Sequence, residues 1–179
     1  MLANRLRMCS GRPAPFILVF TSSQTYTIPI GVDKLDITVV GGGGRGGWAE
    51  EGIGCGSGGG GGGYVKNSYN VAVTEGKSIS IVIGAGGGNS SFGDIVSNAG
   101  ALGGSQWINA GNIVGGSGGN GGSGGGAGGS YNGTKTGKDG GTNGSDGGNE
   151  TGTYATIGGT GQGTTTIGVN NVRYAGDDD

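Results

Sequence analysis

The side chains best suited to chemistry in this sequence are aromatic rings and amides set between runs of glycine. They lie in three insertions, at residues 48–57, 102–114 and 131–154. An aromatic ring in a glycine-rich loop offers a large apolar face to a sugar ring or a protein anchor at a small entropic cost. A neighbouring amide adds hydrogen bonds. The candidate binding residues are Trp48, Trp107, Asn109, Tyr131, Asn132 and Tyr154. The alternative for each tryptophan is packing, either over a thin core or against a neighbouring subunit.

Catalytic chemistry is poorly represented. The chain contains no histidine, which is the commonest general base and zinc ligand. Cys9 and Cys55 are far apart in the sequence and form no CxxC pair. Glu50 and Glu51 are adjacent, so in a strand they would point to opposite faces. We therefore expect a protein that is not an enzyme and that uses no cofactor and no metal.

Nucleotide, nucleic-acid and membrane binding are also disfavoured. Strings that match G-x-G-x-x-G are frequent because glycine is so common, but none opens a helical pattern. The 10 basic and 12 acidic residues give a net charge of −2. This charge balance does not favour binding to the phosphates of nucleic acid. No segment approaches the roughly 18 apolar residues of a membrane span. We expect no nucleic-acid partner and no membrane insertion.

The glycine content limits the folds that can hold any of these side chains. Glycine makes up 52 of the 179 residues, while proline contributes only 3. Glycine brings no side chain to a core and loses much conformational freedom on folding, so backbone hydrogen bonds must hold such a chain. Irregular glycine blocks and scarce proline exclude a collagen helix. Two structures remain for residues 115–152: a flexible linker, or a lattice of polyglycine-II helices that exchange N–H and C=O bonds.

Apolar segments between the glycine runs alternate as half-buried strands do. Residues 16–41 predict a three-stranded meander, and the strands Tyr64 to Val73 and Ser78 to Ile83 predict a hairpin. Residues 91–96 predict a further strand, and residues 164–167 with 171–174 would close the domain. The predicted fold class is all-β, with short antiparallel strands, a polyglycine-II helix lattice and no significant α-helix. Residues 1–15 form an N-terminal arm in this prediction, and residues 16–179 form one glycine-rich β/polyglycine domain.

The order of the strands and glycine runs resembles a known family. The segments FTSSQTYTIPIGVDKLDITVVGGGGRGG, GSGGGGGGYVKNSYNVAVTEGKSISIVIGAGG and SSFGDIVSNAGALGG, followed by GQGTTTIGVNNVRYAG, resemble the glycine-rich domain at the tips of bacteriophage tail fibres. The resemblance implies a non-enzymatic virion adhesin whose loops bind a host cell-surface glycan or protein. The alternative is a structural virion component, such as a capsid fibre, decoration or cement protein, without host binding.

Assembly is a further expectation. A chain with 31% hydrophobic residues, few of them large, buries a small core, so we expect association with partners. The resemblance implies a homotrimer on the surface of the virion, assembled in the host cytoplasm. Residues 1–15 would attach the domain to other virion proteins.

Overall fold

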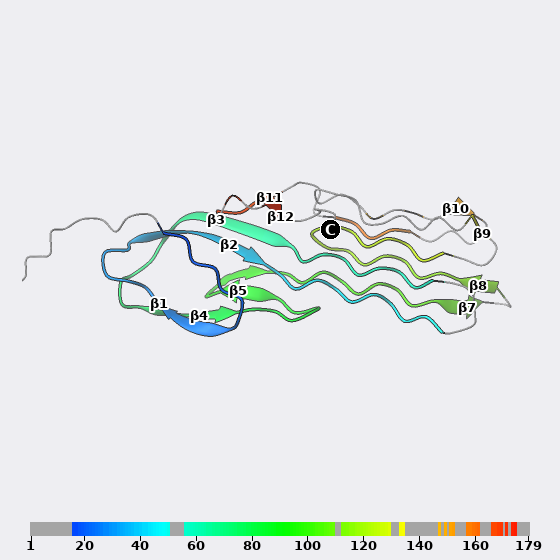
Figure 1. Ribbon diagram of the computed structural model, residues 1–179, viewed down its shortest axis with the longest axis horizontal. Coiled ribbons are helices and arrows are strands. Elements are labelled where there is room, and N and C mark those ends of the chain that lie inside the picture. Colours follow the sequence, from blue (N-terminus) through cyan, green and yellow to red (C-terminus); the bar gives the residue numbers. More distant parts are fainter. Residues whose placement is uncertain are drawn as a thin grey trace, which may run out of the picture.

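The computed structural model describes residues 16–50, 56–109, 112–129, 133–134, 147, 149, 151–152, 157–161, 166–169, 171 and 173–174. These residues form an elongated molecule with two parts, a β part near the beginning of the chain and a bundle of extended glycine segments beyond it (Figure 1). The described residues contain strands but no α-helix, so the predicted all-β class is confirmed.

Two antiparallel sheets build the β part. The first has four strands in the order β1-β4-β5-β6, and the second pairs β2 with β3. Four further short strands form the pairs β7–β8 and β9–β10, and two more form β11–β12. The bounds are β1 (Gln24–Thr27), β2 (Lys34–Val40), β3 (Val65–Ala72), β4 (Ser78–Val82), β5 (Ser90–Phe92), β6 (Ile95–Ser97), β7 (Trp107–Asn109), β8 (Asn112–Val114), β9 (Gly133–Thr134), β10 (Thr151–Gly152), β11 (Thr166–Ile167) and β12 (Arg173–Tyr174).

A small apolar core lies within the β part. Side chains alternate across each strand, so Ile37 and Val39 of β2 turn inward while Val40 stays partly exposed. Val65 of β3 and Ile81 of β4 are also buried. The most deeply buried apolar side chain is Ile28, directly after β1, which is 1% exposed.

Most of the predicted strands exist, but they pair differently from the prediction. Residues 91–96, predicted as one strand, instead form parts of β5 and β6, which pair with each other across a turn at residues 93–94. β1 and β2 are neighbours in sequence and lie in different sheets, so the three-stranded meander is wrong, and residues 16–20 form no strand. β3 and β4 are not a hairpin either. The turn between them binds Ile28, whose N–H donates to the Lys77 carbonyl at 2.9 Å while its carbonyl accepts from Gly76 N–H at 2.8 Å. These bonds continue the β1–β4 ladder, so the turn carries the chain from one sheet to the other.

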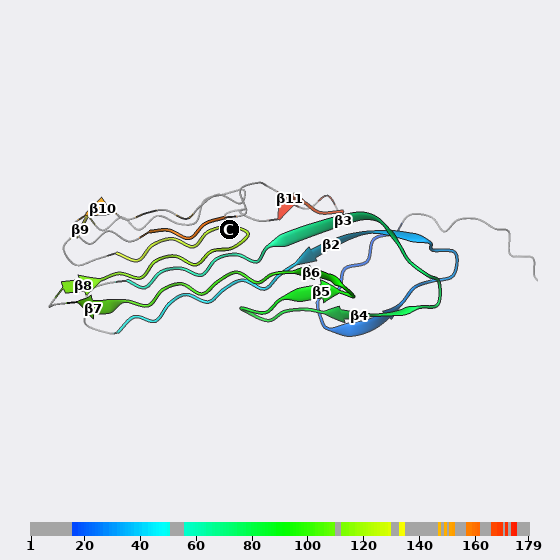
Figure 2. The same cartoon turned by 180° about the vertical axis from the view of Figure 1, so that it is seen from behind.

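Glycine-rich segments continue beyond the sheets as parallel and antiparallel extended runs. We number six of them in chain order. Their ranges are run 1 (residues 41–50), run 2 (56–64), run 3 (98–106), run 4 (115–122), run 5 (123–129) and run 6 (157–161). Figure 2 shows them from behind, lying side by side along the long axis of the molecule.

Backbone hydrogen bonds between the runs recur at every third residue. Run 1 donates to antiparallel run 2 from Gly41, Gly44 and Gly47, at distances of 2.7–2.9 Å. Run 2 donates to run 3 from Gly58, Gly61 and Tyr64, and to run 5 from Gly56, Gly59 and Gly62. A period of three is the repeat of a polyproline-II-type helix, which has no internal hydrogen bonds. The predicted polyglycine-II arrangement is therefore present, and we call runs 1–6 the polyglycine bundle.

The bundle has two layers. Run 2 is bonded to runs 1, 3, 4 and 5, while runs 1 and 3, 3 and 4, and 4 and 5 are bonded to each other. Run 6 joins runs 4 and 5. These contacts place runs 1, 2 and 5 in one layer and runs 3, 4 and 6 in the other. Residues 115–129 are thus hydrogen-bonded into both layers, which excludes the flexible-linker alternative for that segment.

Close approach of neighbouring backbones makes many of these glycines obligatory. A Cβ atom at Gly61 would lie within 3.0 Å of the carbonyl oxygens of Gly119 and Asn120 in run 4. Contacts this short with backbone atoms require the runs to separate, which breaks the hydrogen bonds between them. Gly86, in the turn between β4 and β5, differs because its Cβ would meet no atom nearer than the Gly43 oxygen at 3.6 Å.

We predict that Gly61→Ala lowers the free energy of unfolding by about 1–3 kcal/mol or more, because the methyl group overpacks the interface between runs 2 and 4. Gly86→Ala is the control and should change it by less than about 1 kcal/mol. Urea denaturation followed by circular dichroism measures both. Equal effects of the two substitutions would contradict the steric account of the bundle.

Candidate functional site

Five run ends lie together at the end of the bundle farthest from the sheets, which we call the distal end (Figure 1). Runs 1, 3 and 5 end there and runs 2 and 4 begin there, with the β7–β8 and β9–β10 pairs nearby. Backbone bonds hold these run ends together. Gly56 N–H donates to the Gly129 carbonyl at 3.0 Å, and the Gly56 carbonyl accepts from Gly116 N–H at 3.1 Å.

Trp48 occupies the end of run 1 and presents its side chain to solvent. Its N–H donates to Ser105 Oγ at 3.0 Å, and its carbonyl accepts from Gln106 N–H at 3.1 Å. The Trp48 side chain nevertheless remains 65% exposed, so it is no part of the core. A fixed backbone with an exposed ring is the arrangement that an aromatic binding residue needs, because little freedom is lost when a ligand stacks on it.

Gln106 is a distal residue that the sequence prediction passed over. Its side chain is 8% exposed, and its Nε2 donates to the Glu50 carbonyl at 3.2 Å. Its Oε1 is buried without a hydrogen-bond partner. Gln106 thus fixes the backbone two residues beyond Trp48 from inside the bundle. Its only signal in the sequence is that it is the large polar residue ending run 3, directly before Trp107.

The other predicted binding residues fall into two groups. Trp107 and Asn109 lie in β7, where Trp107 pairs with Val114 and Asn109 pairs with Asn112 beside the turn. Since Gln106 is bonded to Trp48, the structure brings the Trp107 backbone to the same end of the molecule as Trp48. Residues 102–106 of the predicted insertion belong to run 3 rather than to a loop. The remaining candidates, Tyr131, Asn132 and Tyr154, lie outside the described residues.

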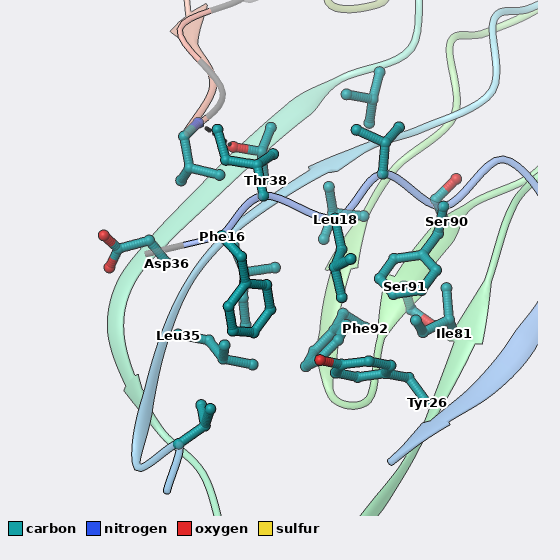
Figure 3. Close-up of a pocket in the computed structure, with 18 of the residues that line it drawn as sticks. Phe16, Leu18, Tyr26, Leu35, Asp36, Thr38, Ile81, Ser90, Ser91 and Phe92 are labelled. Carbon is teal, nitrogen blue, oxygen red and sulfur yellow. Dashed lines mark hydrogen bonds between the residues drawn. The ribbon is translucent and has the colours of Figure 1, made fainter. Parts of the chain in front are cut away.

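A hollow with a volume of about 1190 Å³ lies in the β part, between the two sheets. Phe16 and Leu18 line it from the segment before β1, Tyr26 from β1, Leu35 from β2 and Phe92 from β5 (Figure 3). The Tyr26 hydroxyl is buried there without a hydrogen-bond partner. The lining suits an apolar group. Trp48 does not belong to its lining.

Among the described residues, no group of three or more His, Cys, Asp or Glu side chains is arranged to hold a metal ion. Nor does this part of the chain contain a helix with the length and hydrophobicity needed to cross a membrane.

The fold defines a class of protein, a β domain that carries a polyglycine bundle. The model of the glycine-rich domain family matches residues 19–178, and the chain belongs to that family. No curated protein and no solved structure matches the chain.

The Ser105 hydroxyl provides a test of how firmly the distal backbone is held. We predict that Ser105→Ala speeds hydrogen exchange of the Trp48 amide by roughly 2- to 12-fold, because it removes one hydrogen bond worth about 0.5–1.5 kcal/mol. Ser117→Ala, at an exposed position in run 4, is the control and should leave that amide unchanged. Exchange read by NMR distinguishes the two. An unaltered Trp48 amide in Ser105→Ala would show that the loop is held by other contacts.

Proposed function

We propose that this chain is a non-enzymatic receptor-binding protein, the adhesin of a bacteriophage tail-fibre tip, and that its distal loops bind a glycan or protein on the host cell surface. The observation that carries the proposal is the exposed ring of Trp48 on a hydrogen-bonded backbone at the distal end. Glycine runs have no side chains with which to recognise a ligand, so specificity must reside in the residues between them.

The shape of the molecule supports this assignment. The sheets and residues 16–20 lie at one end, and Trp48 with the β7–β8 and β9–β10 pairs lies at the other (Figure 1). A bundle held by backbone bonds keeps the loops at a distance from the β part. Such a division suits a virion surface protein that is attached at one end and contacts a cell at the other.

Attachment to the particle is proposed for the end that carries the β part. Residues 16–19 precede β1 and expose apolar side chains, with Ile17 63% and Val19 72% exposed. Apolar side chains this exposed favour burial against another protein. The partner proposed here is another virion protein, contacted through the predicted arm at residues 1–15, which lies outside the described residues, and through residues 16–19 beside it.

Trp48→Ala tests the proposal. The probe is an array of bacterial surface glycans, comprising lipopolysaccharides and capsular polysaccharides, together with whole bacterial cells of several species. We expect the wild-type chain to bind some of these surfaces and Trp48→Ala to lose at least about tenfold in affinity, since a buried aromatic anchor commonly contributes 2 kcal/mol or more.

Tyr69→Ala is the matched control. Tyr69 is an exposed aromatic residue of β3, 59% exposed, in the β part rather than at the distal end. Its replacement should leave binding unchanged. Equal loss in the two variants would contradict a distal site. Absence of binding to every surface, combined with loops that are protected from protease in intact particles, would favour the structural virion component instead.

A further inference from the structure

The two faces of the polyglycine bundle are chemically different. The layer of runs 3, 4 and 6 exposes side chains along its length. These are Leu102, Ser105, Ser117, Asn120, Ile157 and Thr160. The layer of runs 1, 2 and 5 exposes Arg45, which lies beside Gly86, and Trp48 at its distal end. Elsewhere it exposes glycine, at Gly43 and Gly46 of run 1 and Gly59 of run 2. We call this second surface the bare face.

Run 2 has an unused row of hydrogen-bonding groups on the bare face. Successive N–H groups of a threefold helix point about 120° apart. Two of the three N–H rows of run 2 donate to runs 3 and 5, and two of its carbonyl rows accept from runs 1 and 4. The third row of both kinds belongs to Ser57, Gly60 and Gly63. These residues have no backbone partner in the described part of the chain, and all three are partly exposed.

Run 1, next to run 2, supplies unpaired carbonyl oxygens. In run 1, the carbonyls of Gly44 and Gly47 accept no hydrogen bond from the described residues, although their N–H groups donate to run 2. A Cβ atom on Gly60 would clash with the Gly44 oxygen, so this carbonyl lies directly against the unused row of run 2. The groove between runs 1 and 2 therefore carries unpaired N–H and C=O groups of run 2 beside unpaired carbonyls of run 1, both with a spacing of three residues.

Two exposed glycines beside this groove, Gly43 and Gly46, are not required by the chain's own packing. A Cβ atom at Gly43 would have the Gly61 oxygen as its nearest neighbour at 3.7 Å, and one at Gly46 would have the Gly58 oxygen at 3.6 Å. These are ordinary contact distances, so this chain alone tolerates a side chain at either position. Glycine at both leaves the groove open to a close-packed backbone from outside.

We propose that the bare face is an interface between two copies of this chain, in which a polyglycine run of one copy lies in the groove between runs 1 and 2 of the other. The occupant follows from the chemistry of the groove. Donors and acceptors repeat every three residues without side chains between them, and the groups that match this spacing at close range belong to another threefold glycine run. Because each copy carries one bare face, the contact is isologous and closes as a dimer.

The test compares substitutions on the two faces in the full chain. Gly46→Gln places a side chain in the groove, and Ser117→Gln adds the same side chain to the opposite face. Sedimentation equilibrium should give twice the 17.1 kDa chain mass for the wild type and for Ser117→Gln, and the mass of one chain for Gly46→Gln. Urea denaturation checks that Gly46→Gln is folded. Its free energy of unfolding is compared with that of the wild type extrapolated to single chains.

Hydrogen exchange gives a second, site-resolved readout. The amides of Gly60 and Gly63 should be protected in the wild type and should exchange freely in Gly46→Gln, while the Gly61 amide, bonded within the chain to Ala101 at 3.0 Å, stays protected in both. A wild type of one-chain mass with freely exchanging Gly60 and Gly63 would overturn the proposal. So would a mass of three chains, or dissociation by Ser117→Gln and not by Gly46→Gln.

Discussion

Backbone hydrogen bonds between threefold glycine runs are the interaction on which this structure depends. Each bond forms only where two backbones approach closely enough to exclude a Cβ atom, as at Gly61 against run 4. The side chains that would normally form a core are correspondingly few, and the buried apolar ones lie mostly in the β part. Glycine therefore has two opposing effects. It raises the conformational entropy lost on folding, and it allows the close approach at which the compensating backbone hydrogen bonds form.

This construction separates support from recognition. The bundle holds its shape without side chains, so side chains are free to vary where the runs end and along the outer layer of runs 3, 4 and 6. At the distal end, Ser105 and Gln106 hold the backbone of residues 48–50 while the Trp48 ring remains in solvent. A rigid support with the exposed Trp48 ring is the physical basis of the proposed adhesin role.

The same construction leaves unpaired backbone N–H and C=O groups at the surface of the bundle. A sheet has unpaired groups only at its edge strands, whereas a threefold helix directs N–H and C=O groups around its whole circumference. Any run in an outer layer therefore keeps an unused row, as run 2 does at Gly60 and Gly63. On the opposite face the Asn120 side chain accepts from the Thr160 N–H at 2.7 Å, whereas the bare face has glycine at Gly43 and Gly46.

Composition and local pattern determined the class of this protein. Abundant glycine with little proline predicted polyglycine helices, apolar alternation predicted the strands of the β part, and the insertions between runs located Trp48 and Trp107. The tertiary structure decided which elements meet. Pairing of β1 with β4 and of β2 with β3 depends on contacts between distant residues, which a local turn signal at residues 74–77 cannot encode. The neighbours of each glycine run were equally undetermined, because runs without side chains have identical surfaces, and only the folded backbone selects their register.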